Sequence, residues 1–333
     1  LAMLLARQAK MAPRKIAELI VARLYQAEPA VYVEKVEIAG AGFINFYMKP
    51  NWLAEGLADA AARGAAFGES NFGQGERVNI EFVSANPTGE LHLGNARGAA
   101  IGDSLANIMQ AAGFQVEREY YINDAGKQIE NFGLSLEARY LEQLGQPAEF
   151  PEDGYHGEDI ISTVKEYIEA EGDKLLTVQP DLRRELLTRF ALQKKLDAIR
   201  TALSHYGVEY DTWFSEQTLH DSGAVKQVVA DYKAAGLLLE QEDALWFAAD
   251  RCGCEKPEVL VRANGIPTYY TADIAYHKNK FERGFARLIN IWGADHHGHV
   301  ARLKAAVGAL GYSAAKLEVS FMQLVRLFSG GEI

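Results

Sequence analysis

The sequence predicts an α/β fold built on a parallel sheet, with a small α+β domain in front of it. Strand-like apolar runs alternate with helical stretches over residues 77–122 and again over 272–328. This alternation is typical of a parallel sheet with helices on both faces. From about 145 to 260 the alternation is lost, which indicates an insertion. A length of 333 residues exceeds one usual core, so more than one domain is expected.

Residues 1–50 form the predicted N-terminal domain. Pro13 suits the start of a helix. The apolar stripe of that helix consists of Ile16, Leu19, Ile20, Val21 and Leu24. Residues 31–48 alternate like two strands joined by a Gly-rich turn. Residues 51–76, an Ala-rich helix followed by FGESNFGQGE, are expected to form a linker.

The opening helical segment is basic. Its cations are Arg7, Lys10, Arg14, Lys15 and Arg23. Such a run is commonly a solvated face, but it also suits contact with nucleic-acid phosphates. The net charge of −11 argues against nucleic-acid binding over the whole surface and leaves room for a local basic face.

Residues 77–333 form the predicted α/β domain. Its first half should contain a strand at 77–84, a helix at 93–112, a strand at 114–122 and a helix from about Asp124. The insertion should hold helices near 180–205 and 221–236 and a strand pair within 237–262. The second half should contain a helix at 272–280, a strand at 287–292, a helix at 296–310 and a strand at 317–328.

Composition excludes several other classes of protein. Hydrophobic residues make up 48% of the chain and charged residues 24%, as in a folded globular protein. No apolar run reaches about 18 residues, so no membrane span is expected. Cys252 and Cys254 are the only cysteines, which argues against a zinc site and fits a reducing cytoplasm.

The most informative stretch is EFVSANPTGELHLGNARGAAIGDSLANIM, residues 81–109. An apolar strand leads through a turn into a helix that opens at His92 and Gly94. Gly allows close backbone approach, and a helix start attracts anions. His92 and Asn95 stand three apart, so both can donate to one bound group. The pattern predicts a nucleotide-phosphate site, and its alternative is a helix cap, since Asn is a favoured N-cap.

Glu81 lies inside the apolar strand, where a carboxylate needs a partner. It must therefore reach an exposed end or meet a cation. Strict alternation would put Glu81 and Asn86 on opposite faces, so the strand must bend or end between them if both are to face one ligand.

The sequence GADHHGH, residues 293–299, follows another apolar strand. Ligands bind at the carboxyl ends of such strands where the sheet order reverses. Asp295 can accept hydrogen bonds from ribose hydroxyls. A metal cluster is the alternative, because Asp and His are competent ligands. Consecutive His296 and His297 point to different faces, however, so we expect no bound metal.

Five segments of the chain resemble one family. They are EFVSANPTGELHLGN, YYINDAGKQI, DTWFSEQTL, TYYTADIAYHKNKFERGF and LINIWGADHHGH. In this order they are similar to the class I aminoacyl-tRNA synthetases, and specifically to arginyl-tRNA synthetase. The resemblance implies a Rossmann-like catalytic domain with an insertion, after an N-terminal domain that touches tRNA.

The resemblance also implies a reaction and its participants. Arginine would attack ATP, supplied with Mg²⁺, to give arginyl-adenylate, and tRNA-Arg would then receive the arginyl group. The protein would be a cytoplasmic monomer. By match to the family motif, His92 and Asn95 would be catalytic at the ATP phosphates, with Gly94 beside them. Further ATP-binding residues would be Gly293, Asp295 and His299.

The same match places five residues around arginine. Glu81, Tyr269 and Asp273 would face the guanidinium, which is always charged and needs carboxylates and a flat partner. Asn86 and His296 would hold the amino and carboxylate groups. Asp273 has an alternative explanation, because an acid in a first helical turn complements the helix dipole. Tyr269 taken alone would be an ordinary strand aromatic.

Two positions depart from the family pattern. Asn95 replaces the second His of the signature, and Asn still donates a hydrogen bond. Gly89 stands where some arginyl enzymes carry Lys and lack a complete Lys-Met-Ser-Lys loop. The resemblance thus implies that loop and an anticodon-binding domain beyond residue 333, and a missing extreme N-terminus, so this chain alone should be poorly active. Another class I-like adenylate-forming ligase and a non-catalytic tRNA-binding paralogue are the alternatives.

Overall fold

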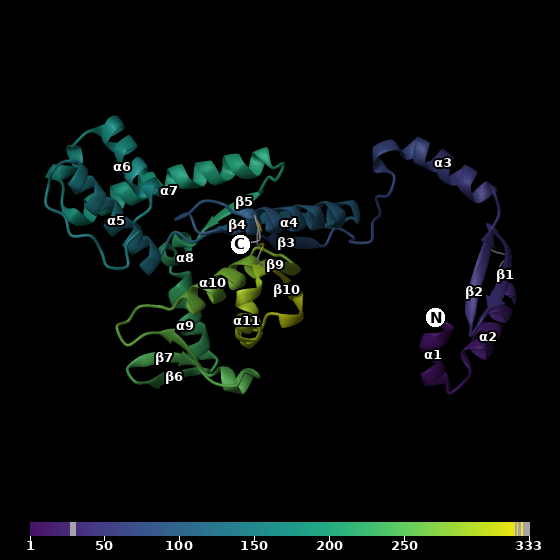
Figure 1. Cartoon of the computed structure of the whole chain (residues 1–333). Helices are drawn as coiled ribbons and strands as arrows, with labels where there is room; N and C mark the ends of the chain where they lie inside the picture. The colour runs from purple at the N-terminus through teal and green to yellow at the C-terminus, as the bar shows by residue number, and fades with distance from the viewer. Residues whose placement is uncertain (27–30, 324, 326–327, 329–333) are drawn as a thin grey trace. The chain divides into compact units, whose positions relative to one another are not determined.

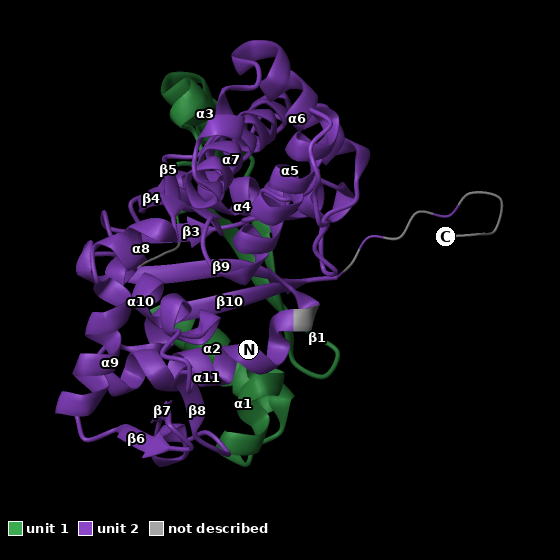
Figure 2. Cartoon of the chain, turned by 90° about the vertical axis from the view of Figure 1, so that its left-hand side faces the viewer, with its two compact units in different colours: residues 1–69 green, residues 70–333 purple. Residues whose placement is uncertain are grey.

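A computed structural model describes residues 1–26, 31–323, 325 and 328, together with all their side chains except that of Asp295. The chain divides into two compact units, Leu1–Glu69 and Ser70–Ile333 (Figure 2). The division falls inside the stretch 51–76 for which a linker was predicted.

Unit 1 is a small α+β unit. Its elements are α1 (Ala2–Ala9), α2 (Pro13–Gln26), β1 (Val33–Ala39), β2 (Phe43–Met48), α3 (Asn51–Arg63) and the 3₁₀ turn η1 (Gly64–Ala66). Pro13 begins α2, and β1 and β2 form an antiparallel hairpin. Ile16 and Ala17 of α2 are buried with Ala2. The predicted stripe is only partly buried, because Leu19 is 53% exposed and Leu24 is 43% exposed.

The central sheet of unit 2 has five parallel strands in the order β10-β9-β3-β4-β5 (Figure 1). Their bounds are β3 Arg77–Glu81, β4 Gln115–Ile122, β5 Thr212–Ser215, β9 Arg287–Gly293 and β10 Leu317–Met322. The predicted α/β fold with a parallel sheet is confirmed. The chain runs from β3 to β4 on one side and places β9 on the other. The sheet order therefore reverses beside β3.

Side chains alternate between the two faces of this sheet. Ile289 and Ile291 of β9 join an apolar cluster with Ala99 and Ala106 of α4 (Leu93–Ala111). Leu288 instead joins a cluster with α10 (Tyr269–Glu282) and α11 (His297–Ala309). Figure 2 shows α4 and α11 on opposite sides of β9 and β10. Helices thus cover both faces, as predicted.

The face under α10 is polar at its centre. The buried polar residues there are Asn79, Glu81, Glu119 and Asn290, none more than 6% exposed. The sheet register sets Glu81 beside both Glu119 and Asn290. Buried polar groups require hydrogen-bond partners, so α10 must supply them.

Two groups of elements lie between β4 and α10, in a stretch that begins before the predicted insertion at about residue 145. The first comprises α5 (Lys127–Gln143), α6 (Glu158–Glu171), η2 (Lys174–Thr177) and α7 (Pro180–His205), which share one apolar cluster. The second comprises α8 (Gln217–Asp221), α9 (Ala224–Ala234), β6 (Leu238–Gln241), β7 (Ala244–Phe247), η3 (Ala249–Cys252) and β8 (Glu258–Val261). Between the two groups, β5 leaves the insertion and extends the main sheet.

Several predicted boundaries were wrong. The helix predicted near 221–236 is present as α9 but begins only at Ala224, after Gly223, whose φ of 77° is left-handed and separates α9 from α8. The strand pair within 237–262 is a three-stranded antiparallel sheet. The last strand ends at Met322 rather than at 328, and residues 324 and 326–327 lie outside the description. Within the described part of the chain, no helix is long and apolar enough to cross a membrane.

Candidate active site at the carboxyl edge of the sheet

Strand β3 ends at Glu81 and is followed by a left-handed turn. Val83 has a φ of 67° and Ser84 a φ of 40°. These angles break the strand alternation, so the expected end of the strand between Glu81 and Asn86 is confirmed. Asn86 is exposed, and its side-chain amide donates to Oε1 of Gln128 at 3.1 Å.

Glu81 meets a cation inside the protein. Its Oε2 lies 2.6 Å from Nζ of Lys280, a side chain with no exposed surface. Its Oε1 accepts from Oγ of Ser84 at 3.2 Å. Lys280 also donates to Oδ1 of Asn290 at 3.4 Å. The sequence predicted that Glu81 either reaches an exposed end or meets a cation. The structure confirms the second of these outcomes.

The second buried carboxylate of this layer is Glu119. It accepts hydrogen bonds from the Tyr276 hydroxyl at 2.6 Å, from Nδ2 of Asn79 at 3.0 Å and from Arg283. Burial, together with the negative charges of Glu81 and Glu119, raises the pKa of Tyr276 well above its usual value. Tyr276 therefore remains a neutral donor.

Asp273, on the first turns of α10, is held by two imidazoles. Its Oδ2 lies 2.5 Å from Nε2 of His299, and its Oδ1 lies 3.0 Å from Nδ1 of His277. Burial tends to raise the pKa of Asp273, but interactions with His277 and His299 outweigh it and hold that pKa well below its usual range. Asp273 is therefore a carboxylate at neutral pH.

His277 links Asp273 to the Glu81 pair. Its Nε2 lies 2.7 Å from Nδ2 of Asn290, which can only donate. Nε2 is therefore the acceptor, and the ring proton lies on Nδ1, which is 2.9 Å from the backbone carbonyl oxygen of Asp273 and 3.0 Å from its Oδ1. A continuous chain of contacts thus runs Glu81–Lys280–Asn290–His277–Asp273.

Tyr269 lies at the solvent-exposed end of this series of contacts, and the residue is 69% exposed. Tyr269 precedes Asp273 by one helical turn, so both project from the same side of α10. Its ring centroid lies 6.0 Å from that of His299. Nη2 of Arg302 approaches Nδ1 of His299 at 3.5 Å and connects it to Glu258. His299 was predicted to bind ATP, and its polar contacts in the structure are to Asp273 and Arg302.

His92, Gly94 and Asn95 form a second group at the start of α4. Nδ1 of His92 accepts from N–H of Gly94 at 3.1 Å, and Oδ1 of Asn95 accepts from N–H of His92 at 2.9 Å. The cap considered as an alternative is thus present. It leaves the amide nitrogen of Asn95 unused by the cap, and it puts the proton of neutral His92 on Nε2. The His92 side chain is exposed, so both remain candidate donors to a phosphate.

A side chain at position 94 would collide with this cap. A Cβ on Gly94 would lie 2.8 Å from Cε1 of His92. Gly is therefore required for the His92 ring to fold back over the helix start. The predicted role, close approach to a phosphate, uses the same lack of a side chain.

The remaining predicted residues follow β9. Gly293 is its last residue, and the backbone of Asp295 lies in the 3₁₀ turn η4 (Ala294–His296), while the Asp295 side chain is outside the description. The ring of His296 lies 5.9 Å from that of Trp292. The groups after β3 and after β9 thus follow adjacent parallel strands where the sheet order reverses, a common place for ligands.

Sequence reasoning missed His277, Lys280 and Asn290. A signal was present, because Asp273, His277 and Lys280 stand four and three residues apart, which puts them on one helix face. Asn290 also interrupts an apolar strand, LINIW, as a buried amide.

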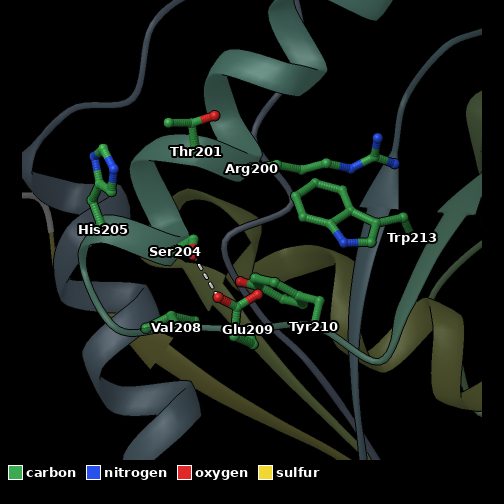
Figure 3. A pocket seen from close by; sticks show the side chains of 8 residues that line it. All are labelled: Arg200, Thr201, Ser204, His205, Val208, Glu209, Tyr210 and Trp213. Carbon is green, nitrogen blue, oxygen red and sulfur yellow. Dashed lines mark hydrogen bonds between the residues drawn. The ribbon is translucent and has the colours of Figure 1, made fainter.

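No group of three His, Cys, Asp or Glu side chains able to hold a metal occurs among the residues that the structure describes. Three pockets of this part of the chain, of about 330, 510 and 1010 Å³, are lined by other residues than those predicted for the site. The smallest lies between the end of α7 and the start of β5 (Figure 3).

The chain also matches two family models. Residues 61–326 match the catalytic domain of tRNA synthetases class I (R), and residues 1–48 match the arginyl tRNA synthetase N-terminal domain. A parallel sheet with its candidate site at the carboxyl edge agrees with the first match. The chain therefore belongs to the class I tRNA synthetases of the arginyl type, and the resemblance inferred from its motifs is confirmed.

Individual relatives agree with this membership. An arginine–tRNA ligase from Moorella thermoacetica is 62% identical over the whole chain, which spans 59% of that protein. A crystal structure named as an arginyl tRNA synthetase from Campylobacter jejuni is 37% identical with a TM-score of 0.77, over 86% of this chain and 62% of that one. The Thermus thermophilus arginyl-tRNA synthetase, 21% identical, shares the fold with a TM-score of 0.69, over 96% of this chain and 59% of that one.

Proposed function

We propose that this chain carries the amino-acid activation site of an arginine–tRNA ligase. The arginine carboxylate would attack the α-phosphate of ATP, forming arginyl-adenylate and releasing pyrophosphate. The terminal adenosine of tRNA-Arg would then take the arginyl group and release AMP. The Mg²⁺ ion would arrive with ATP as part of the substrate. We further propose a monomer acting in the cytoplasm.

The observation that carries this proposal is that exposed Tyr269 and ionised Asp273 stand one helical turn apart on α10. Each oxygen of Asp273 has one imidazole partner, and a carboxylate oxygen can accept more than one hydrogen bond. A guanidinium could therefore bind Asp273 while its flat face lies along the Tyr269 ring. A neutral side chain in the same place would leave Asp273 without that partner, which favours arginine.

Glu81 takes an indirect part in this proposal. Its charge is already balanced by Lys280, so it contributes less than a free carboxylate to guanidinium binding. His299 is proposed to hold the Asp273 carboxylate in place rather than to bind ATP. Asn86 and His296 remain proposed for the amino and carboxylate groups of arginine, and Gly293 and Asp295 for the ribose of ATP.

The phosphates would bind at the start of α4. Nε2–H of His92 and the amide of Asn95 would donate to oxygens whose negative charge grows as pyrophosphate leaves. The helix dipole adds a favourable field at this position. All five basic residues of the opening segment of unit 1, Arg7, Lys10, Arg14, Lys15 and Arg23, are exposed and are proposed to touch tRNA.

Pyrophosphate exchange into ATP tests the proposal. The full-length protein should exchange with arginine and tRNA-Arg present, and not with lysine, glutamate or cysteine. Exchange driven by another amino acid would assign a different ligase, and tRNA binding without any exchange would favour a non-catalytic paralogue.

A substitution pair tests the arginine pocket. Asp273→Asn should raise the KM for arginine by about 100-fold, since a charge-assisted hydrogen bond in a desolvated site is worth roughly 2–5 kcal/mol. Asp231→Asn is the control, because Asp231 pairs with Lys278 on the neighbouring part of α10 and has no proposed role in the pocket. An unchanged KM in Asp273→Asn would reject the assignment.

A further inference from the structure

The turn after β3 has an unfavourable backbone conformation. Val83 and Ser84 both have positive φ angles, of 67° and 40°. Such angles are uncommon outside Gly, and Val is especially unsuited to them because its side chain is β-branched. A turn of this kind persists only where surrounding groups hold it.

Two tyrosine hydroxyls bracket this turn. The hydroxyl of Tyr210 donates to the carbonyl of Phe82 at 3.0 Å, and that of Tyr120 donates to the carbonyl of Ala85 at 2.8 Å. Tyr120 comes from β4, and Tyr210 lies just before β5. The two acceptors stand on either side of Val83 and Ser84.

Ring contacts restrict where these hydroxyls can move. The Tyr210 ring stacks on Phe82 at a centroid distance of 4.7 Å, and the Tyr120 ring stacks on Trp213 at 4.4 Å. Trp213 in turn lies 4.7 Å from the guanidinium carbon of Arg200 (Figure 3). Tyr120 has no exposed surface, and burial keeps the pKa of both hydroxyls above the usual value. Both therefore remain hydrogen-bond donors.

The turn between the two acceptor carbonyls contacts Glu81, a residue of the candidate arginine site, through the side chain of Ser84. Oγ of Ser84 donates to Oε1 of Glu81 and accepts from N–H of Tyr121 at 3.1 Å. Glu81 precedes the bracket and Asn86 follows it. A shift of the turn would therefore move both of these residues.

We propose that Tyr120 and Tyr210 are positioning residues for amino-acid binding, a role that rests on the proposed function. Their hydroxyls hold the left-handed turn and so set the position of Asn86 relative to Glu81. We call this pair the tyrosine clamp. Neither tyrosine touches substrate in this proposal, and both act through the backbone of residues 82–85.

Removal of one hydroxyl tests the clamp in the full-length protein. Tyr210→Phe and Tyr120→Phe should each raise the KM for arginine about three- to tenfold, the equivalent of one neutral hydrogen bond. The KM for ATP should change less than about twofold. Tyr140→Phe is the matched control, because its hydroxyl also donates to a backbone carbonyl, that of Gly172, within the α5–α7 cluster. It should leave both KM values unchanged.

A rescue experiment separates positioning from general packing. Gly adopts left-handed angles without steric penalty. Val83→Gly should therefore restore the KM for arginine to within about twofold in the Tyr210→Phe background. A variant that had merely lost packing would not be rescued in this way, and failure of the rescue would overturn the proposal.

Hydrogen exchange of the peptide covering residues 82–86, without substrate, gives a readout independent of the reaction. Exchange should be faster in Tyr210→Phe and Tyr120→Phe than in the wild-type protein and in Tyr140→Phe. Unchanged exchange in folded clamp variants would reject the clamp. Faster exchange in a protein that shows no arginine-dependent reaction would instead reject the proposed function and leave the clamp as a structural device.

Discussion

Lys280 and Glu81 form an ion pair inside the molecule, with Nζ 2.6 Å from Oε2 and no exposed surface on the lysine. The pair lies between α10 and the end of β3, and Glu119 lies 4.0 Å from the same ammonium group. Two carboxylates that would otherwise repel each other are thus held beside a shared cation. The pair is connected to Asp273 through Asn290 and His277.

Lys280→Met should destabilise unit 2 strongly. It would leave Glu81 buried without its cation, and breaking a buried pair from one side typically costs about 3–5 kcal/mol. The double variant Glu81→Gln/Lys280→Met should recover part of that loss, because it removes both charges. Urea unfolding of the three proteins measures the difference. If the double variant is as unstable as the single one, the pair does not balance charge as described.

Substitution of His92 separates capping from catalysis. His92→Asn should keep the helix start, since Asn is a favoured N-cap, while His92→Ala should lose about 1 kcal/mol of stability. Both variants should lose pyrophosphate exchange by about 100-fold or more, because both lack the Nε2 donor. Thermal unfolding and exchange assays on the same samples give the comparison. Wild-type exchange in His92→Asn would mean that His92 is only a cap.

The contribution of Asp273 to stability should depend on pH in the acid range. Its pKa is lowered in the folded protein, chiefly by His277 and His299 acting against burial. The stabilisation from the carboxylate is therefore fully present above the unfolded value of about 3.9 and is lost as pH falls below it. The stability difference between wild type and Asp273→Asn should shrink as the pH falls from 5 toward 3. A difference that grows over this range would contradict this sign.

Gly102 should not tolerate a methyl group. A Cβ at this position on α4 would lie 2.2 Å from the ring of Phe82, the residue that directly follows β3. Gly102→Ala should therefore lower the melting temperature, with a stability loss of about 1–3 kcal/mol from overpacking. Gly298→Ala, on α11 with open space around the new methyl group, is the matched control and should be neutral or stabilising.

Much of the fold could be read from the residue pattern, whereas the roles proposed for the site residues came from the resemblance to a family. Apolar runs of strand length alternating with helical runs predict a parallel sheet, since successive parallel strands need a crossover connection, which is usually a helix. The motifs around His92 and Gly293 predicted groups that follow strands of one sheet, and the structure places these strands, β3 and β9, side by side. The break after Glu81 followed from strand alternation together with the expectation that Glu81 and Asn86 face the same ligand.

Contacts between distant segments could not be read in this way. Lys280 lies 199 positions from Glu81, and Tyr210 lies 128 positions from Phe82. A buried charge shows in the sequence only as a need for a partner, and many lysines of the chain could meet it. The choice depends on the register that sets β3 beside β9 and on the face that α10 turns toward the sheet. Both are set by packing across the whole domain. In that packing, buried polar groups must find hydrogen-bond partners at the same time as apolar side chains are buried.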